Sequence, residues 1–356
     1  MKRINVFLAV LLMTFAVGYG EQINRYGSTA ASFLEIGMGS APSSMGEAYV
    51  AVTGDMSGIY WNPASVAYLQ KSGFTVMYQP WLVDINTVFA TGAVIMPGIG
   101  TLGLTLTQVG YGEMEVTNLA NQDGTGEFFT ANDFAVGVSY ARKIANWFSF
   151  GTTAKMINSK IWHESASAFA VDLGVIVKTQ FFSPTGEKGS GLDIGMSISN
   201  YGTRMQYDGI DLVQPIDISP DESGNYGDVI GQYRTQAWEL PLMFRIGLSY
   251  KPIQTSMHSL TLAADALHPN NNSESINVGA EYAMKLSRTG KFFLRGGYKT
   301  LYMDASDDRE QALFGLTAGG GIELFVVGNR SIKVDYAFKE AGIMGRTHAY
   351  TLGLTF

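Results

Sequence analysis

Four histidines are the residues of this sequence best suited to acid–base or metal chemistry near neutral pH: His163, His258, His268 and His348. They fall on different predicted connections or strand ends, and no pair has the spacing of metal ligands. The sequence has no cysteine, so it offers no thiolate and no disulfide. A serine hydrolase would need a serine beside a histidine, an alternative that His348, at a strand start, leaves open. We predict no enzymatic activity, no metal site and no cofactor.

Acidic residues crowd one predicted connection: Asp304, Asp307, Asp308 and Glu310. Such a group could hold Ca²⁺ or bridge lipopolysaccharide through a divalent ion, but a solvated acidic loop is the commoner explanation. The glycine run 319–321 lies within a predicted strand and is followed by no helix, so it is no phosphate loop. We expect it to make room for a neighbouring segment or to bend the wall.

Ten further charged residues lie at alternate positions of strand-like segments, opposite the apolar residues. They are Lys155, Asp172, Asp193, Arg245, Asp265, Glu281, Arg295, Lys299, Lys333 and Asp335. Both signs occur in near balance, which predicts ion pairs in an enclosed lumen and contacts with a segment inside it. A selective ion pathway is the alternative, although a selective ring of charges would favour one sign.

Apolar and polar residues alternate with a period of two from residue 72 onward, which is typical of strands with two different faces. A continuous reading gives about fourteen segments, most of them long enough for a tilted strand to cross a bilayer. The segments are 72–81, 84–97, 100–112, 131–143, 147–160, 166–179, 190–203, 237–251, 257–267, 274–286, 290–303, 311–325, 330–340 and 347–356.

The predicted connections alternate in length, which tests the strand count independently. Short turns alternate with longer connections such as 113–130 and 204–236, as in transmembrane barrels. Four tryptophans, Trp81, Trp147, Trp162 and Trp238, fall at strand ends, as expected for aromatic girdles at a membrane interface. The alternative is a soluble β-sandwich, but its strands are seldom this long. We therefore predict an all-β membrane protein, a closed antiparallel transmembrane β-barrel of about 14 strands.

The chain begins with features of a secretory signal peptide. Lys2 and Arg3 precede an apolar run, 6–17, and small residues precede a cleavage site near Gly20. The net charge is −7, charged residues make up only 15% of the chain, and 42 of its residues are glycine. An acidic exported protein is a poor candidate for nucleic-acid binding. We predict a bacterial outer-membrane protein whose surroundings include outer-membrane lipid and lipopolysaccharide.

The residues before the first strand have a different pattern and predict short helices. Ser44 and Glu47 have capping-box spacing, which predicts a helix over 45–52. Asn62 followed by Pro63 predicts a second helix start, continuing over 64–69. Helices this short need a cavity to occupy, and a barrel of about fourteen strands has one. We predict a signal peptide at 1–20, a helical N-terminal hatch at 21–71, in or under the lumen, and a barrel at 72–356.

The hatch carries the candidate gate residues Ser44, Glu47, Trp61, Asn62, Pro63 and Ala64. We expect Asn62, Pro63 and Ala64 to start a compact turn that plugs or gates the lumen, with Trp61 wedging it against the wall. The alternative is that this turn only caps a helix on the periplasmic rim.

The last predicted strand ends at the final residue of the sequence. Tyr350, Leu352, Leu354 and Phe356 alternate to the terminus. This resembles the signal by which the barrel assembly machinery recognises bacterial outer-membrane barrels. The resemblance implies that machinery as a partner.

Residues 34–69 resemble the amino-terminal segment of the PorV/PorQ family, within the wider FadL-like (long-chain fatty-acid transporter-like) group of barrels. The motifs that carry the resemblance are GMG at 37–39, SMGEAYVA at 44–51, TGD at 53–55 and YWNPA at 60–64. Two positions depart from the family pattern: Gly54 stands where a second acid is common, and Ser65 stands where a glycine is common. These departures leave the expected fold unchanged and weaken assignment to a subfamily.

The resemblance implies two candidate functions. In the first, the barrel binds or shuttles exported cargo proteins in a type IX-like secretion system, with secretion-system components as further partners. A contact surface is then expected on the two long connections, 113–130 and 204–236. The apolar part of that surface, or equally a lid over the pore, is expected on the second connection at Ile210, Leu212, Val213, Pro215 and Ile216. The alternative is passive FadL-like transport of hydrophobic small molecules, for which a strand interruption at Pro241 would mark a lateral opening.

Overall fold

The computed structural model confirms a closed antiparallel β-barrel of fourteen long strands. It describes residues 27–81, 83–183, 186, 189–219, 221–222, 229–286, 289–302, 314–326, 328, 330–342 and 345–356. The predicted signal peptide and the acidic cluster at 304–310 lie outside these residues. None of the helices in the described part of the chain is long and apolar enough to cross a membrane.

The barrel strands follow the predicted segments closely. They are β1 (Gly73–Pro80), β2 (Asn86–Met96), β3 (Gly100–Glu115), β4 (Phe128–Ala145), β5 (Phe148–Ile161), β6 (Glu164–Lys178), β7 (Asp193–Gly202), β11 (Met243–Gln254), β12 (His258–Pro269), β13 (Ser275–Leu286), β14 (Gly290–Tyr302), β15 (Leu316–Val326), β16 (Arg330–Glu340) and β17 (Arg346–Thr355). The largest difference is β11, predicted to start at residue 237. Pro241 therefore precedes this strand, where its missing amide hydrogen interrupts no ladder.

Each barrel strand pairs with its neighbours in the chain, and the ring closes between the first strand and the last. β1 and β17 are antiparallel with Gly73 opposite Thr355, and the Phe356 amide extends the seam by donating to the Ser72 carbonyl at 2.9 Å. β7 pairs with β11 because three short strands between them leave the wall. Closure removes the free edges that would otherwise expose unpaired backbone groups to lipid.

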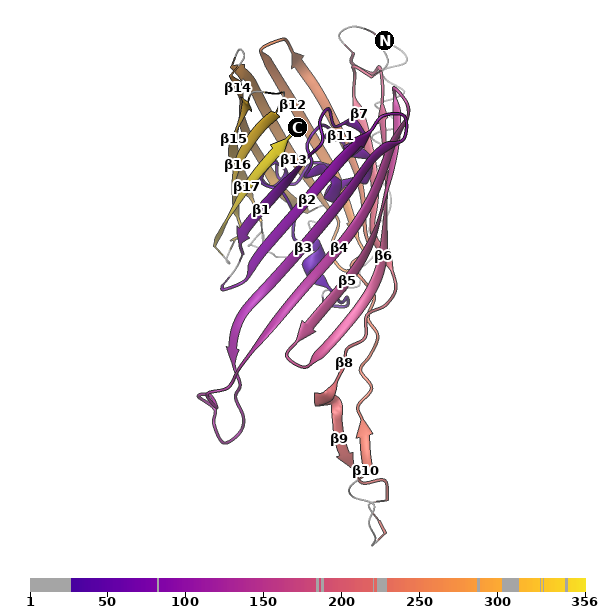
Figure 1. Cartoon of the computed structure of the whole chain (residues 1–356), viewed down its shortest axis with the longest axis vertical. Coiled ribbons are helices and arrows are strands. Elements are labelled where there is room, and N and C mark those ends of the chain that lie inside the picture. Colours follow the sequence, from indigo (N-terminus) through magenta and orange to yellow (C-terminus); the bar gives the residue numbers. More distant parts are fainter. Residues whose placement is uncertain are drawn as a thin grey trace.

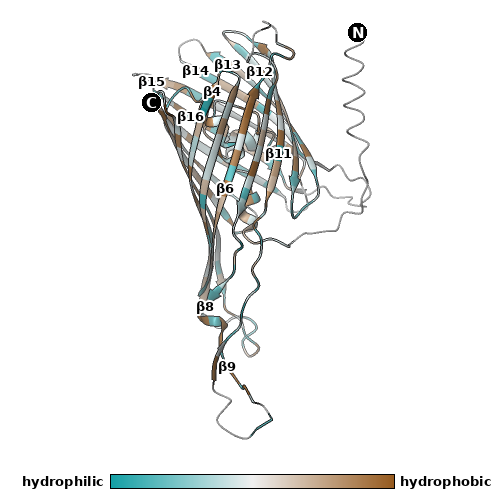
Figure 2. Ribbon diagram, turned by 90° about the vertical axis from the view of Figure 1, so that its right-hand side faces the viewer, coloured by the Kyte–Doolittle hydropathy of each residue, from teal (hydrophilic) through white to brown (hydrophobic). Residues whose placement is uncertain are grey.

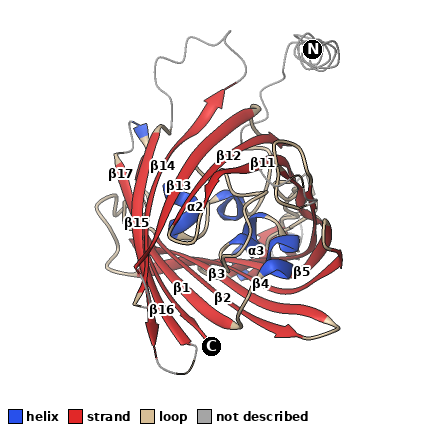
Figure 3. Cartoon of the chain, turned by 90° about the horizontal axis from the view of Figure 1, so that it is seen from above, coloured by secondary structure: helices blue, strands red, loops and turns tan. Residues whose placement is uncertain are grey.

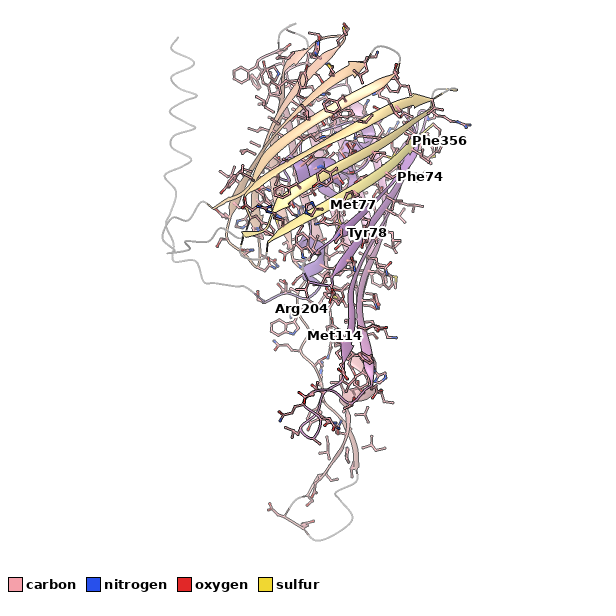
Figure 4. The ribbon with its side chains drawn as sticks, turned by 90° about the vertical axis from the view of Figure 1, so that its left-hand side faces the viewer. Phe74, Met77, Tyr78, Met114, Arg204 and Phe356 are labelled. Atoms are coloured by element: carbon pink, nitrogen blue, oxygen red, sulfur yellow. The ribbon has the colours of Figure 1, made fainter. Side chains whose placement is uncertain are left out.

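The alternation of the sequence separates an apolar outer face from a polar lumen. On β1, Phe74 and Tyr78 are 45% and 47% exposed, whereas Met77 between them is buried (Figure 4). Aliphatic residues recur on the outside of the other strands (Figure 2), for example Leu104, Val138 and Leu173. Such a face is stable in hydrocarbon and costly in water, which is why the wall belongs in a bilayer.

One side of the barrel is taller than the rest and carries a projecting arm (Figure 1). β3 to β6 have 14 to 18 residues, against 8 to 13 in the other barrel strands. The arm contains β8 (Asp208–Gly209), the 3₁₀ turn η3 (Ile210–Leu212), β9 (Val213–Ile216) and β10 (Val229–Gln232). It leaves from the long-loop end, which faces the cell exterior in outer-membrane barrels.

The N-terminal segment occupies the lumen as a set of short helices (Figure 3). They are η1 (Ser32–Glu35), α2 (Ser40–Ser44), α3 (Gly58–Trp61) and η2 (Pro63–Tyr68). Their apolar side chains pack against inward residues of the wall, as Met38 and Ile59 do with Met77 and Phe89. From here on, the word hatch denotes residues 29–69, which lie within the segment predicted at 21–71.

The helix expected over 45–52 was wrong. α2 instead ends at Ser44, whose hydroxyl donates to the Ala41 carbonyl within that helix. Gly46 and Glu47 both have left-handed backbone angles, with φ of 64°, which no α-helix continues through. The capping-box spacing is therefore not used as a cap, because the Glu47 carboxylate is bound by the barrel wall.

Glycines on the inner wall let the hatch backbone touch the strands. At nine positions a Cβ would come closer than 3 Å to hatch atoms: Gly73, Gly103, Gly151, Gly174, Gly195, Gly247, Gly279, Gly297 and Gly319. Gly319 belongs to the glycine run singled out in the sequence, and its neighbour is the Ser44 side chain. The wall thus lacks side chains where the hatch is seated.

We predict that Gly279→Ala weakens seating of the hatch, because the new methyl group would overlap the Met45 carbonyl oxygen. Overpacking of this kind costs about 1–3 kcal/mol. The measurement is urea unfolding in detergent micelles. Gly296→Ala is the matched control, since its Cβ would meet its nearest neighbour at an ordinary 3.8 Å. Equal stability of the two variants would contradict tight seating at β13.

Candidate functional site

Glu47 is the electrostatic anchor of the hatch. Its two carboxylate oxygens bind Lys299 Nζ of β14 at 2.7 Å and Lys339 Nζ of β16 at 2.9 Å. Glu47 and Lys339 are 3% and 2% exposed. A buried ion pair of this kind stabilises only while both partners are present, because a single remaining charge would be buried without compensation.

The protonation of Glu47 follows from this geometry. Burial alone would raise the pKa of its carboxyl group, but the Lys299 and Lys339 ammonium groups outweigh burial and lower the pKa to about 2. Because the folded pKa is depressed, the stabilisation is fully present above about pH 4.5. It is lost as the pH falls towards 2.

Asp55 makes the second anchor, at the short-turn end of the lumen. Its carboxylate binds Lys333 Nζ at 2.5 Å, and Lys333 also contacts Asp335 at 3.2 Å. Arg295 continues the chain of charges, binding Asp335 at 2.6 Å and Glu281 at 2.7 Å. Five side chains of alternating sign therefore link the hatch to β13, β14 and β16.

Asp265 and Asn62 hold the middle of the hatch through its backbone. The Asp265 carboxylate accepts the amides of Tyr49 at 2.6 Å and Val50 at 2.9 Å. The Asn62 side-chain amide donates to the Val50 carbonyl within the hatch at 2.9 Å and to the Val175 carbonyl of the wall strand β6 at 3.0 Å. Tyr49 and Val50 belong to no helix or strand, so the bonds to their amides and to the Val50 carbonyl satisfy backbone groups that no regular element pairs.

Asn62 also starts the predicted turn. Its side-chain oxygen accepts the Ala64 amide at 3.0 Å, and Pro63 is the first residue of η2. Trp61 is 1% exposed, and its indole nitrogen donates to the Met38 carbonyl at 3.0 Å. The turn is therefore enclosed in the lumen, and Pro63 lies against Gly151 of the wall.

The remaining inward charges form separate groups on the wall. Lys155 binds Asp172 at 2.8 Å and contacts the Asn200 side chain, whose backbone has a left-handed φ of 65°. Asp193 binds Lys178 at 2.5 Å near the short-turn end. The ten predicted lumenal charges are thus distributed over the lumen rather than gathered in one ring.

Two cavities lie on opposite sides of the hatch. The short-turn cavity, about 610 Å³, is bounded by Asp55, Lys71, Lys285 and Lys333 among others. The long-loop cavity, about 250 Å³, is bounded by Trp61, Trp81, Arg245 and Lys299 among others. The hatch separates the two cavities.

The residues proposed for a cargo or lid surface lie on the arm, far from the hatch. Ile210, Val213 and Pro215 are exposed, whereas Leu212 and Ile216 are partly buried. The arm points away from the barrel (Figures 1 and 2), which differs from a lid folded over the pore.

The histidines lie outside the lumenal network. The ring nitrogen of His163 contacts Asp211, and that of His268 contacts Glu274. His258 contacts the Tyr282 hydroxyl, and His348 contacts the Tyr336 hydroxyl. None of these partners is a serine hydroxyl. In the described part of the chain no group of three or more metal-ligating side chains occurs.

Sequence reasoning missed three important groups. Lys339 has the same strand parity as Lys333 and Asp335, so the alternation alone could have found it. Asp55 and Glu35 belong to the hatch, where no periodicity shows which way a side chain points. Their roles emerge only from contacts with strands far along the chain.

Comparison with known proteins identifies a protein family from the sequence and related barrels from the structure. The profile of the family described as Type IX secretion system protein PorV matches residues 20–223. No curated protein matches the sequence. The solved structures that the chain resembles are barrels of similar length.

Three of these structures illustrate the likeness. A FadL homologue from Pseudomonas aeruginosa has 13% identity and a TM-score of 0.50, covering 90% of this chain and 98% of that one. The toluene transporter TodX of Pseudomonas putida has 10% identity and a TM-score of 0.54, with 90% and 97% covered. The toluene transporter TbuX of Ralstonia pickettii has 9% identity and a TM-score of 0.53, with the same coverage. At these identities the likeness shows the fold alone.

We predict that Glu47→Gln destabilises the protein by about 3–5 kcal/mol at pH 7, because it leaves two lysines buried without a counter-charge. Urea unfolding in micelles measures the change, and the difference from wild type should shrink as the pH falls from 4.5 towards 2. The control is Glu239→Gln, whose exposed pair with Arg204 is worth less than about 1 kcal/mol. Equal effects of the two substitutions would contradict the role of the Glu47 ion pairs as an anchor of the hatch.

We predict that Asn62→Ala loosens the hatch, because the carbonyls of Val50 and Val175 lose a donor. The expected cost is about 1–3 kcal/mol, together with a higher single-channel conductance in planar bilayers. Asn158→Ala, at an exposed hydrogen bond to Ser167, is the control and should leave conductance unchanged. A wild-type conductance in the Asn62 variant would remove the gate hypothesis.

Proposed function

Because the chain belongs to the family of the type IX secretion system protein PorV, we propose that it binds exported cargo proteins through its projecting arm. The fold and the family place the protein in the bacterial outer membrane. The arm then reaches into the extracellular space, where a translocated protein would be met. The observation that carries the proposal is the arm itself, which projects from the barrel (Figure 2) and carries exposed apolar side chains.

Large apolar side chains are exposed along the arm although no lipid lies beside them. Ile210, Ile218 and Ile230 are 69%, 63% and 78% exposed, and Tyr233 is 61% exposed. Exposed apolar patches beyond the membrane band are typical of protein-binding sites. Aromatic and aliphatic anchors of this type carry most of the binding energy in protein interfaces.

The base of the arm is held by hydrogen bonds, so the surface is presented in a defined place. Met205 and Trp238 exchange two backbone bonds of 2.8 Å, and the Thr235 hydroxyl donates to the Tyr207 carbonyl at 2.5 Å. β8 pairs with the end of β6, which makes the arm a continuation of the tall wall. Preorganisation of this kind lowers the entropy cost of binding a partner.

The seating of the hatch supports recognition outside the barrel rather than passage through it. Moving the hatch would break the Glu47 and Asp55 ion pairs together with the Asp265 and Asn62 bonds. A protein chain could pass only after all of these were lost. We propose secretion-system components and cargo as the partners, with lipopolysaccharide and the barrel assembly machinery as further partners during residence and insertion.

A second candidate is passive transport of hydrophobic small molecules. One observation favours it: β7 kinks at Asn200, and the wall beyond is completed by the Asn200 side chain donating to the Pro241 carbonyl at 2.9 Å. Opening of this contact would make a lateral path. The charged residues that bound both lumenal cavities suit hydrocarbons poorly, so we rank transport second.

We predict that replacing 208–232 with a short Gly-Ser linker abolishes cargo binding while the barrel still assembles. The linker keeps the Met205–Trp238 pairing intact. The sharper variant is the double substitution Ile210→Asp and Ile230→Asp, expected to weaken cargo binding by ~1,000-fold, the sum of two hot-spot losses of about 2 kcal/mol each. Binding is measured with purified cargo and the detergent-solubilised barrel.

Val83→Asp is the matched control, because Val83 is 94% exposed on the β1–β2 connection and lies outside both long connections. It should bind cargo as the wild type does. Heat-modifiable migration in gels reports assembly of every variant. Full cargo binding by the arm deletion would overturn the proposal, and retained uptake of a hydrophobic compound would then favour transport.

A further inference from the structure

Arg245 is a buried cation without an ion-pair partner among the described residues. It is 4% exposed and extends from β11 into the lumen. The hydrogen bond assigned to its guanidinium goes from Nη1 to the Ser199 hydroxyl at 3.1 Å, and its buried Nε has no partner there. Its other close contact is the ring of Trp61, 5.4 Å from the guanidinium carbon.

A buried guanidinium group destabilises the folded protein unless an opposite charge or hydrogen-bond acceptors compensate for its lost hydration. A guanidinium group has five N–H donors and binds planar oxyanions with two parallel bonds. Burying a charge without an opposite charge is strongly unfavourable. The other buried cations of this lumen, such as Lys299, Lys339 and Arg295, each have a carboxylate partner. Arg245 alone among these four has none.

The guanidinium borders the long-loop cavity. The rim includes Asn272, which is exposed, and the walls include the polar side chains of Ser32 and Ser275 beside the rings of Trp61 and Trp81. Hydroxyl and amide groups there can hydrogen-bond a polar ligand. The cavity is small, about 250 Å³, so it suits a short molecule rather than a long hydrocarbon chain.

The acids nearest to this cavity form no ion pair with Arg245 in the described part of the chain. Glu47 is bound by two lysines, and Asp265 accepts the Tyr49 and Val50 amides through Oδ2 and acts on Arg245 only as a nearby charge. Glu35 lies on the hatch side of the cavity, and burial raises the pKa of its carboxyl group despite a bond from Asn271 and the nearby charges of Arg245 and Lys299. Its tendency to ionise is therefore reduced.

We propose that the long-loop cavity binds the carboxylate of a short polar molecule, with Arg245 as the anion-binding residue. The carboxylate would take the guanidinium donors, and the Asn272 and Ser275 side chains would contact the polar body. Two sources share this chemistry: the free carboxyl terminus of a peptide and a small organic acid. The site is distinct from the arm, and its occupancy does not depend on cargo binding there.

The test is calorimetric titration of the full chain in dodecyl maltoside, supported by tryptophan fluorescence. The probes are acetate, N-acetyl-dialanine, the carboxamide of that dipeptide, and decanoate. We expect both polar carboxylates to bind and the carboxamide to bind ~10- to 100-fold more weakly, the range for losing a hydrogen bond to a charged group. Tighter binding of the dipeptide than of acetate identifies a peptide terminus as the source, and equal affinity identifies a small acid.

Variants locate the site. Arg245→Gln should lose ~10- to 100-fold in affinity for the carboxylates, whereas Arg142→Gln, an exposed arginine at the other end of the barrel, should bind as wild type. Ser275→Leu fills the cavity without removing the charge and should also abolish binding, which keeps the test decisive if the Arg245 variant fails to fold.

Three results would overturn the proposal: wild-type affinity in the Arg245 or Ser275 variant, equal binding of carboxylate and carboxamide, or preferential binding of decanoate. Because no cargo enters this titration, its failure leaves the proposed role of the arm untouched. Likewise, if the arm deletion still binds cargo, carboxylate binding in the long-loop cavity is not contradicted.

Discussion

The inner wall and the hatch neutralise each other's charges, and the rest of the structure depends on this exchange. Lys299 and Lys339 on the wall are neutralised by Glu47, and Lys333 is neutralised in part by Asp55. In return, Asp265 of the wall satisfies hatch amides that no helix or strand pairs. Either component alone would expose buried charge or unpaired backbone, so the lumen and its contents are one folding unit.

This mutual dependence keeps the hatch in the lumen, and the proposed cargo-binding surface therefore lies outside the barrel. Among the described residues, a cavity of about 610 Å³ and one of about 250 Å³ lie on either side of a hatch that is seated on wall glycines and ion pairs. The features that extend beyond the seated core are the tall wall of β3 to β6 and the arm that continues it (Figure 1). A family defined by protein secretion is consistent with a barrel that acts as a fixed platform.

Sequence alone predicted what depends on period and on single local signals. Alternation identified the barrel strands because one face meets lipid and the other does not, and Asn62-Pro63 was found because its cap is made within two residues. The helix at 45–52 failed because Glu47 contacts residues about 250 and 290 positions away, which no local spacing reveals. The same limit hid Asp55 and the unpaired state of Arg245. The start of β11 was misplaced because the residues before Pro241 continue the alternation, whereas in the structure Trp238 bridges to Met205 at the base of the arm and Glu239 bridges to Thr29 of the hatch.

The seam between β1 and β17 carries a consequence for biogenesis. Ser40 of α2 touches Thr351 of β17, with its hydroxyl 2.7 Å from the threonine hydroxyl, so the hatch meets the strand that completes the ring. A finished cylinder has no slack through which these helices could later be threaded, because backbone meets backbone at the wall glycines. Closing the β1–β17 seam around a hatch already in place would form these backbone contacts without first having to open them.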